Sequence, residues 1–337
     1  MLGAFGSHSV ALRPLISRIA IAILQLVSTQ LANAQLQNNF HGVSCPGAEF
    51  TVRSVVDIAL GKERGLGAGL VRMHFHDCFV NGCDGSVLID STPGNPSEKD
   101  AAPNFGTLRG FEIIDAAKAQ LEANCPGVVS CADILAFAAR DSVSFLGGIF
   151  WLVKSGRRDG NISRASDVVN NLPGPSFNLQ ALTQSFLAKG LSQTEMITLS
   201  GAHTIGQAHC AAFTDRLYNF NSNGSQDPSL DPEYAKRLKL LCPQNNTNPN
   251  TVVPLDPLTA DIFDNSYFTN VVTGQALFSS DEALFTDTAT IATVQSNSLN
   301  GFPWSLDFAQ AMIKMSEIGV LTGQQGEIRK NCRVINS

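Results

Sequence analysis

No long basic run occurs in the 337-residue sequence, and charged residues make up only 15% of it. Nucleic-acid-binding surfaces need clustered lysines and arginines, and the formal net charge here is -6. Nucleic acid is therefore not an expected partner. The low charge also excludes a disordered chain, since hydrophobic residues reach 44%. A chain of this length can bury a full hydrophobic core.

Hydrophobic runs of ~20 residues, the length of a membrane span, are absent after the N-terminal region, so no membrane partner is expected. Residues 1–34 have the pattern of a secretory signal peptide, in which a basic segment precedes the apolar core 19–27. Small residues form a cleavage site that ends at Ala34. We expect a secreted mature chain that begins at Gln35, and an uncleaved anchor is the alternative.

Cysteine pairs with C-x-x-C spacing are missing, which argues against structural zinc. All eight cysteines follow the expected cleavage site. An even number in a secreted chain predicts four disulfides, although the spacing alone does not fix their pairing. Sequons at Asn161, Asn223 and Asn245 are candidate N-glycosylation sites.

Alternating β patterns and internal repeats are rare, and the apolar periodicity predicts a mainly α protein. The predicted helices span residues 48–61, 66–79, 109–122, 131–140, 179–189 and 308–318. Residues 80–108, 219–232 and 243–258 are expected to be loops. Ser130 and the capping box Ser192-x-x-Glu195 should each begin a helix, and Gly190 should end one.

Histidines are few, and their spacing argues against a zinc hydrolase. On a helix, His74 and His76 diverge by about 200°, so they cannot share a metal. Arg72, Phe75 and His76 instead share one helix face, which would place a cation and a titratable base beside an aromatic wall. Isolated histidines suit a site in which one ligates a metal and another acts on substrate. No C-x-x-C-H motif for covalent haem occurs, and His203 taken alone is more often structural.

The motif Arg72-x-x-Phe75-His76-Asp77-Cys78 is followed by Ala102-Pro103-Asn104 and by Gly201-Ala-His203-Thr204-Ile-Gly206. Together these motifs closely resemble the plant secretory (class III) haem peroxidases, the family that includes horseradish peroxidase. The resemblance covers essentially the whole mature chain, including all eight cysteines.

The resemblance implies the mainly α haem-peroxidase fold, with one non-covalent haem b between a distal half (about 35–178) and a proximal half (about 179–337). It also implies a monomer secreted to the apoplast or cell wall. Such an enzyme reduces hydrogen peroxide through a high-valent iron–oxo intermediate and oxidises small phenolic or aromatic donors in one-electron steps. A non-catalytic, secreted, calcium-binding, disulfide-stapled protein is the alternative.

The resemblance also assigns catalytic roles. His76 would move the peroxide proton, Arg72 would stabilise developing charge, and Phe75 would wall the iron. Asn104 would hold His76, with Glu98 supporting Asn104. On the other face, His203 would be the haem iron ligand and Asp281 would accept its second ring N–H. Pro173 would meet aromatic donors.

Two calcium ions are implied as well. The first site would use Asp77, Val80, Gly82, Asp84, Ser86 and Glu98, and the second would use Thr204, Asp256, Thr259, Ile262 and Asp264. For the segment Asp84-Gly-Ser86 alone, a simple turn is the equal alternative.

The implied disulfides are Cys45–Cys125, Cys78–Cys83, Cys131–Cys332 and Cys210–Cys242, and Asp133 with Arg157 matches a buried ion pair of the family. Two kinds of departure from the family pattern occur. His41 replaces a usual aromatic residue, and Ala102, Ser176 and Ala212 stand where some relatives carry phenylalanine at the access rim. The small rim residues predict a wider mouth and weaker capture of small phenols.

Overall fold

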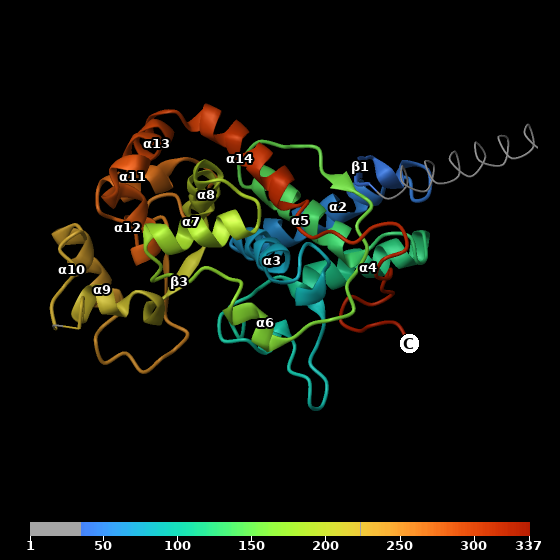
Figure 1. The fold of residues 1–337 in the computed structure, drawn as a ribbon, viewed down its shortest axis with the longest axis horizontal. Coiled ribbons are helices and arrows are strands. Elements are labelled where there is room, and N and C mark those ends of the chain that lie inside the picture. The colour runs from blue at the N-terminus through green and yellow to red at the C-terminus, as the bar shows by residue number, and fades with distance from the viewer. Residues whose placement is uncertain (1–34, 223) are drawn as a thin grey trace, which may run out of the picture.

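The computed structural model describes residues 35–222 and 224–337, and Figure 1 shows it as a ribbon. The expected signal peptide and the sequon residue Asn223 lie outside the described residues. Helices dominate the described part of the chain and its strands are short. The predicted mainly α fold is therefore confirmed.

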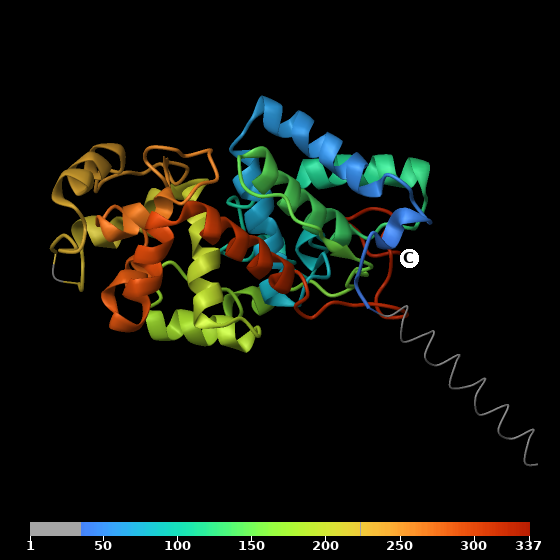
Figure 2. The same cartoon turned by 90° about the horizontal axis from the view of Figure 1, so that it is seen from above.

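The first group of helices precedes residue 178. It comprises α2 (Ala48–Lys62), α3 (Leu66–Val80), α4 (Phe111–Asn124), α5 (Cys131–Phe145) and the short α6 (Ala165–Val169). Ser130 caps α5 as predicted, because its Oγ accepts a hydrogen bond from the Asp133 backbone N at 3.1 Å. Every residue of α5 from Cys131 to Val143 is buried, and α2, α3 and α4 all pack against this helix. Helix α3 is thereby held in the interior, as Figure 2 shows.

The second group of helices follows residue 178. It comprises α7 (Leu179–Ala188), α8 (Gln193–Ser200), α9 (Thr214–Tyr218), α10 (Pro232–Leu241), α11 (Ser266–Val272), α12 (Ser279–Thr286), α13 (Thr288–Leu299) and α14 (Gly301–Met315). The capping box of Ser192 and Glu195 begins α8, as predicted. Gly190 takes a positive φ of 79° just after α7, a backbone conformation that favours glycine.

Several helices were not predicted from the sequence. Helices α6 and α9 to α13 are missing from the prediction, and α14 begins at Gly301 rather than at residue 308. The loop 80–108 also contains the 3₁₀ turns η2 (Ser86–Leu88) and η3 (Glu98–Asp100). Short helices depend on caps more than on periodicity: Asp231 caps α10 by accepting from the Tyr234 N at 2.8 Å.

Two small antiparallel pairs complete the secondary structure of the described residues. Strand β1 (Gln37–Asn38) pairs with β2 (Lys154–Ser155), and β3 (Gln207–His209) pairs with β4 (Val252–Pro254). The second pair directly follows the turn that carries His203. No helix in the described part of the chain is long and apolar enough to cross a membrane.

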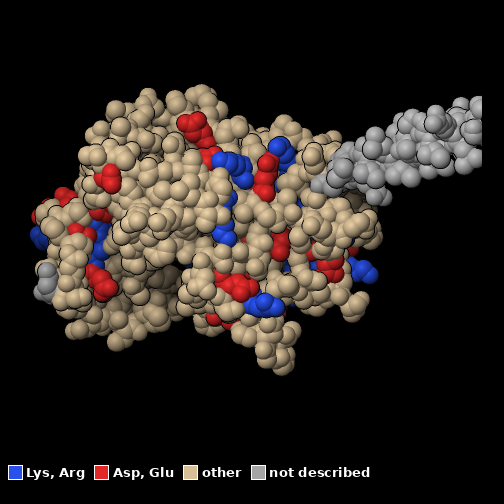
Figure 3. Space-filling view, viewed as in Figure 1, with Lys and Arg blue, Asp and Glu red and all other residues tan. Residues whose placement is uncertain are grey.

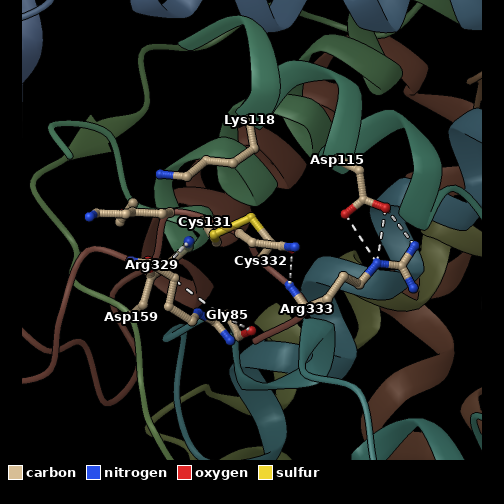
Figure 4. Close-up of a disulfide and its surroundings, with 12 residues drawn as sticks. Gly85, Asp115, Lys118, Cys131, Asp159, Arg329, Cys332 and Arg333 are labelled. Carbon is tan, nitrogen blue, oxygen red and sulfur yellow. Dashed lines mark hydrogen bonds and ion pairs between the residues drawn. A yellow bond between two sulfur atoms is a disulfide. The ribbon is translucent and has the colours of Figure 1, made fainter. Parts of the chain in front are cut away.

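Four disulfides join the same cysteines that the resemblance implies, namely Cys45–Cys125, Cys78–Cys83, Cys131–Cys332 and Cys210–Cys242. Figure 4 shows how Cys131–Cys332 holds the C-terminal tail. Beside it, the Arg329 Nη2 donates to the Gly85 carbonyl at 2.6 Å, and Arg333 pairs with Asp115 at 2.6 Å. The tail is thereby fastened to α4, to α5 and to the loop behind α3.

Candidate active site

The distal side chains project from α3, the helix that the first group encloses. His76 is 6% exposed, and its ring shares a hydrogen bond of 2.6 Å between Nδ1 and the Asn104 Oδ1. Because an amide oxygen only accepts, Nδ1 carries the proton and Nε2 keeps its lone pair. The Asn104 Nδ2 in turn donates to the main-chain carbonyl of Glu98 at 2.8 Å. Glu98 therefore orients Asn104 through its backbone, and its carboxylate is left for other contacts.

Arg72 lies one helical turn before His76 and faces the same space. Its Nε donates to the His76 Nε2 at 3.2 Å. The rest of the guanidinium is fixed by the Pro103 carbonyl at 2.8 Å and by the Thr107 carbonyl at 3.0 Å and hydroxyl at 3.1 Å. Sequence reasoning missed Thr107, since a threonine in a loop carries no signal of its own.

The electrostatics of this pair favour a neutral base beside a cation. Burial first, and then the Arg72 charge, lower the pKa of His76 to about 3, although the hydrogen bond to Asn104 opposes the shift. Burial lowers the pKa of Arg72 to about 10, so the guanidinium stays charged at neutral pH. Phe75 packs its ring against Phe79 at a centroid distance of 4.4 Å and closes one side of the space.

The proximal residues come from the second group of helices. His203 lies in the 3₁₀ turn η4 (Gly201–Thr204) directly after α8. Its Nδ1 and the Asp281 Oδ1 are 2.8 Å apart, and Asp281 is buried in the first turn of α12. Gly201 allows the turn to approach α14, because a Cβ there would lie 2.5 Å from the Trp304 ring.

Tyr267 is a proximal residue that sequence reasoning missed. Its hydroxyl donates to the same Asp281 Oδ1 at 2.9 Å, and its ring meets the His203 ring edge-on at 5.9 Å. The only sequence signal is its position three residues after Asp264, on the helix that follows the second candidate calcium site. The Tyr267 hydrogen bond competes with His203 for the electron density of that carboxylate.

The free ring nitrogen of His203 fits a haem iron. With Nδ1–H directed at Asp281, the Nε2 of His203 keeps a lone pair and has no hydrogen-bond partner among the described residues. The His203 side chain is 38% exposed, whereas the Asp281 side chain behind it is 4% exposed. An imidazole with one oriented nitrogen and one open nitrogen is the donor that a five-coordinate haem requires.

The first candidate calcium site lies behind His76, where three carboxyl groups are buried together. Burial, followed by the charges of Asp84 and Glu98, raises the pKa of Asp77 well above its usual value. Burial likewise raises the pKa of Asp84, and raises that of Glu98 to about 8. The Ser86 hydroxyl lowers the pKa of Asp84 and Glu98, yet its Oγ and the Glu98 Oε2 are buried without a hydrogen-bond partner of good geometry in the described chain.

A hard cation would relieve the repulsion among these three carboxyl groups and would bind the oxygens that lack a hydrogen-bond partner. Backbone N–H groups of Gly85 and Val87 occupy part of the Asp77 carboxylate, at 2.9 and 3.3 Å. Within residues 35–222 and 224–337, no group of three or more His, Cys, Asp or Glu side chains has the arrangement of a metal site. A cation here would therefore also need hydroxyl and carbonyl oxygens, including those of Val80 and Gly82.

The second candidate calcium site lies next to His203 and is a connected set of oxygens. The Thr204 hydroxyl donates to the Asp264 Oδ1 at 2.9 Å, and the Thr259 hydroxyl donates to the Asp256 Oδ2 at 2.8 Å. Ser266, which was not predicted, joins the two halves because its hydroxyl contacts both Thr259 and Asp264. Ile262 follows in the same loop, where its backbone N donates to the Thr259 carbonyl at 2.9 Å.

The remaining predicted residues are placed as follows. Asp133 and Arg157 form a fully buried ion pair at 2.9 Å, and the His41 Nε2 adds a third partner 2.8 Å from Asp133. Pro173 is half-buried, whereas Ala102, Ser176 and Ala212 are all exposed. Asn161 and Asn245 are exposed, as a glycosylated residue must be.

Charged side chains are scattered over the face drawn in Figure 3, where lysines and arginines alternate with acidic residues. No basic patch is visible on that face. The surface there is hollowed between the two groups of helices, close to the position of α7 and β3 in Figure 1.

Comparison with known proteins gives consistent matches along the chain. A sequence profile described as peroxidase matches residues 52–300. The chain is 56% identical over 317 residues to Peroxidase 5 of Vitis vinifera, covering 94% of this chain and 96% of that protein. It is 50% identical over 307 residues to Peroxidase 3 of Arabidopsis thaliana (90% and 93%). It is 48% identical over 322 residues to a lignin-forming anionic peroxidase of Nicotiana sylvestris (95% and 97%).

Proposed function

Because this chain belongs to the class III plant peroxidase family and is a haem peroxidase, we propose that it oxidises small phenolic donors, with His76 and Arg72 acting on peroxide and His203 holding the iron. One observation carries the proposal: His76 is a neutral base with an unprotonated Nε2 beside the Arg72 cation, while His203 has an open Nε2 backed by Asp281. These are the two halves of a peroxide-cleaving site.

The chemistry of the distal residues follows from their protons. Haem, when bound through His203, supplies the redox-active iron at which peroxide is cleaved. The His76 Nε2 accepts a proton from one peroxide oxygen and returns it to the departing oxygen, a general acid–base function worth about 10²–10⁴ in rate. The Arg72 guanidinium stabilises negative charge on the departing oxygen. Peroxide must take the place of the Arg72 N–H at the His76 Nε2.

The proximal residues prepare His203 for its role. Asp281 accepts the Nδ1–H, which fixes the tautomer and makes the imidazole a stronger donor. Phe75 limits the approach of large substrates. The name of the lignin-forming relative from Nicotiana sylvestris supports phenolic donors, which would meet the chain near Pro173. Two calcium ions, one at each candidate calcium site, would stabilise the segments that carry His76 and His203.

The remaining proposals concern location and assembly. A cleavable segment before Gln35 supports secretion to the apoplast or cell wall. Glycosylation at Asn161, Asn223 and Asn245 would follow from that route. We also propose that the protein is a monomer with a distal and a proximal half around the haem, and that it binds neither nucleic acid nor membrane. Gel filtration of the secreted protein tests the monomer.

Substitution of the two histidines tests the proposed function. We expect His76→Ala to retain a haem Soret band and to lose about 10²–10⁴ of the rate of reaction with peroxide. We expect His203→Ala to lose stable haem ligation. His209→Ala is the matched control, since its Nδ1 bonds only the Pro249 carbonyl near the surface. Rapid reaction of the His76→Ala protein with peroxide would rule out the acid–base assignment.

A further inference from the structure

A pocket of about 440 Å³ lies between residues 169–172 and α7. This volume falls within the range of about 300–1,000 Å³ that is typical of small-molecule sites. Its lining includes the apolar side chains of Leu172, Phe177 and Ala181 and the polar side chains of Asn171 and Lys189. A ligand that fits it must combine an apolar body with a polar end.

Lys189 supplies the charge at the polar end. It lies at the C-cap of α7 and is half-buried. Its Nζ donates to the Asn171 Oδ1 at 2.7 Å, and the Asn171 Nδ2 donates to the Asp167 carbonyl at 2.8 Å. The ammonium is thus held in place by an amide that is itself anchored, and it keeps two N–H groups for another acceptor.

No carboxylate neutralises this cation. Among the described residues, none of the ion pairs involves Lys189. Burial lowers the pKa of Lys189, with no acidic neighbour to oppose it. A bound anion would supply the missing partner.

The apolar residues of the pocket lie close in sequence to Pro173, where phenolic donors would meet the chain. Leu172 and Phe177 flank Pro173 in the sequence, and both line the pocket. The turn between them is closed by a hydrogen bond from the Phe177 N to the Gly174 carbonyl at 3.1 Å. The Pro175 carbonyl accepts from the Ser280 N at 3.0 Å, which fastens the turn to α12. The half-buried Phe177 ring therefore presents a fixed surface on which a second aromatic ring can pack.

We propose that this pocket binds small aromatic acids, with the carboxylate on the Lys189 ammonium and the ring against Phe177 and Leu172. The inference rests on the proposed function and deepens it, because it selects phenolic acids from among the phenolic donors. The apolar wall holds the ring, and the unpaired cation distinguishes an acid from the corresponding neutral alcohol.

Calorimetric titration of the holoenzyme with 4-hydroxycinnamate and with its neutral alcohol tests the pocket. We expect Lys189→Met to weaken binding of the acid about five- to tenfold and to leave binding of the alcohol unchanged. Lys189→Arg should retain the preference, because it keeps the charge. Lys236→Met is the matched control: it removes the same charge from a lysine whose side chain is 73% exposed on α10.

Equal affinity of the wild-type and Lys189→Met proteins for the acid would overturn the proposal that the acid binds at Lys189. An equal loss of affinity in the Lys236→Met control would overturn it as well. Steady-state oxidation of the neutral alcohol separates this inference from the proposed function. Peroxide-dependent turnover of the alcohol, together with equal affinity of the wild-type and Lys189→Met proteins for the acid, leaves the function intact and rejects binding of the acid at Lys189. Absence of turnover with either donor rejects the proposed function, while the calorimetry still shows whether the acid binds at Lys189.

Discussion

His76 illustrates how a single residue is prepared for catalysis by its surroundings. The two shifts that lower its pKa to about 3 come from burial and from Arg72. Since the pKa in the folded protein lies below the usual value near 6.5, the unfolded chain binds more protons between pH 3 and 6.5. His76 therefore costs stability as the pH falls through this window, and in exchange it stays an unprotonated base under mildly acidic conditions.

The lowered pKa of His76 predicts how the reaction with peroxide depends on pH. We expect the rate constant for reaction with peroxide to stay flat from pH 7 to about 5 and to fall as the pH approaches 3, where His76 becomes protonated. Arg72→Leu removes a cation that lowers the pKa of His76, so the acid limb should move toward neutral pH. Stopped-flow measurements across this range provide the check. An acid limb at the same pH in both proteins would contradict the assignment of that limb to His76.

At the residue scale, the sequence predicted side chains that belong to compact motifs. Arg72 and His76 share a helix face, and their 3.2 Å contact follows from that spacing. Tyr267 and Thr107 were missed for the opposite reason. Each reaches its partner across the fold, over 14 and 35 residues of chain, and no local pattern reports such a contact.

At the scale of elements, the long helices α2 to α5 and the capping box of α8 were predictable, whereas helices such as α12 were not. Helices α2 to α5 were predicted because each carries regularly recurring apolar residues over several turns. Helix α12, which carries Asp281, spans only Ser279–Thr286. Nucleating so short a helix is unfavourable in isolation, so tertiary packing decides whether it forms.

The loop after α3 contains most of the first candidate calcium site, so the effect of calcium on stability can be predicted for it. We expect chelation with EDTA to lower the Tm by several degrees and to reduce activity, and added calcium to restore both, because a ligand that binds only the folded state stabilises it. Ser86→Ala removes an unpartnered hydroxyl that a cation would use. Its Tm should match the wild type in EDTA and fall below it in calcium.

Differential scanning calorimetry in the two buffers makes this comparison. Ser91→Ala is a suitable control, since that hydroxyl lies outside the candidate calcium site and already bonds Ser97 and Asp100. It should change the Tm equally with and without calcium. A Tm that EDTA does not change would contradict both calcium sites.

At the scale of the whole molecule, the chain closes on itself through its tail. Cys131–Cys332 joins residues 201 apart, whereas Cys78–Cys83 joins residues 5 apart. No periodicity could have placed the tail beside α5, and only the family resemblance implied this pairing. The long link also brings Arg329 to Asp159 and Arg333 to Asp115, as Figure 4 shows. We therefore expect Cys131–Cys332 to contribute mainly to the stability of the fold, and Cys78–Cys83 to contribute mainly to the local geometry of the loop behind His76.

Removing each disulfide should separate these two contributions. In the loop-entropy model, the 201-residue link contributes about 5 kcal/mol to the free energy of unfolding and the 5-residue link about 2 kcal/mol. We expect replacement of Cys131 and Cys332 by serine to cause the larger loss in urea unfolding. Replacement of Cys78 and Cys83 should instead affect peroxide reactivity more, because that link braces the loop directly behind His76. Equal losses of stability from the two pairs would show that the tail is held mainly by its arginines, Arg329 and Arg333.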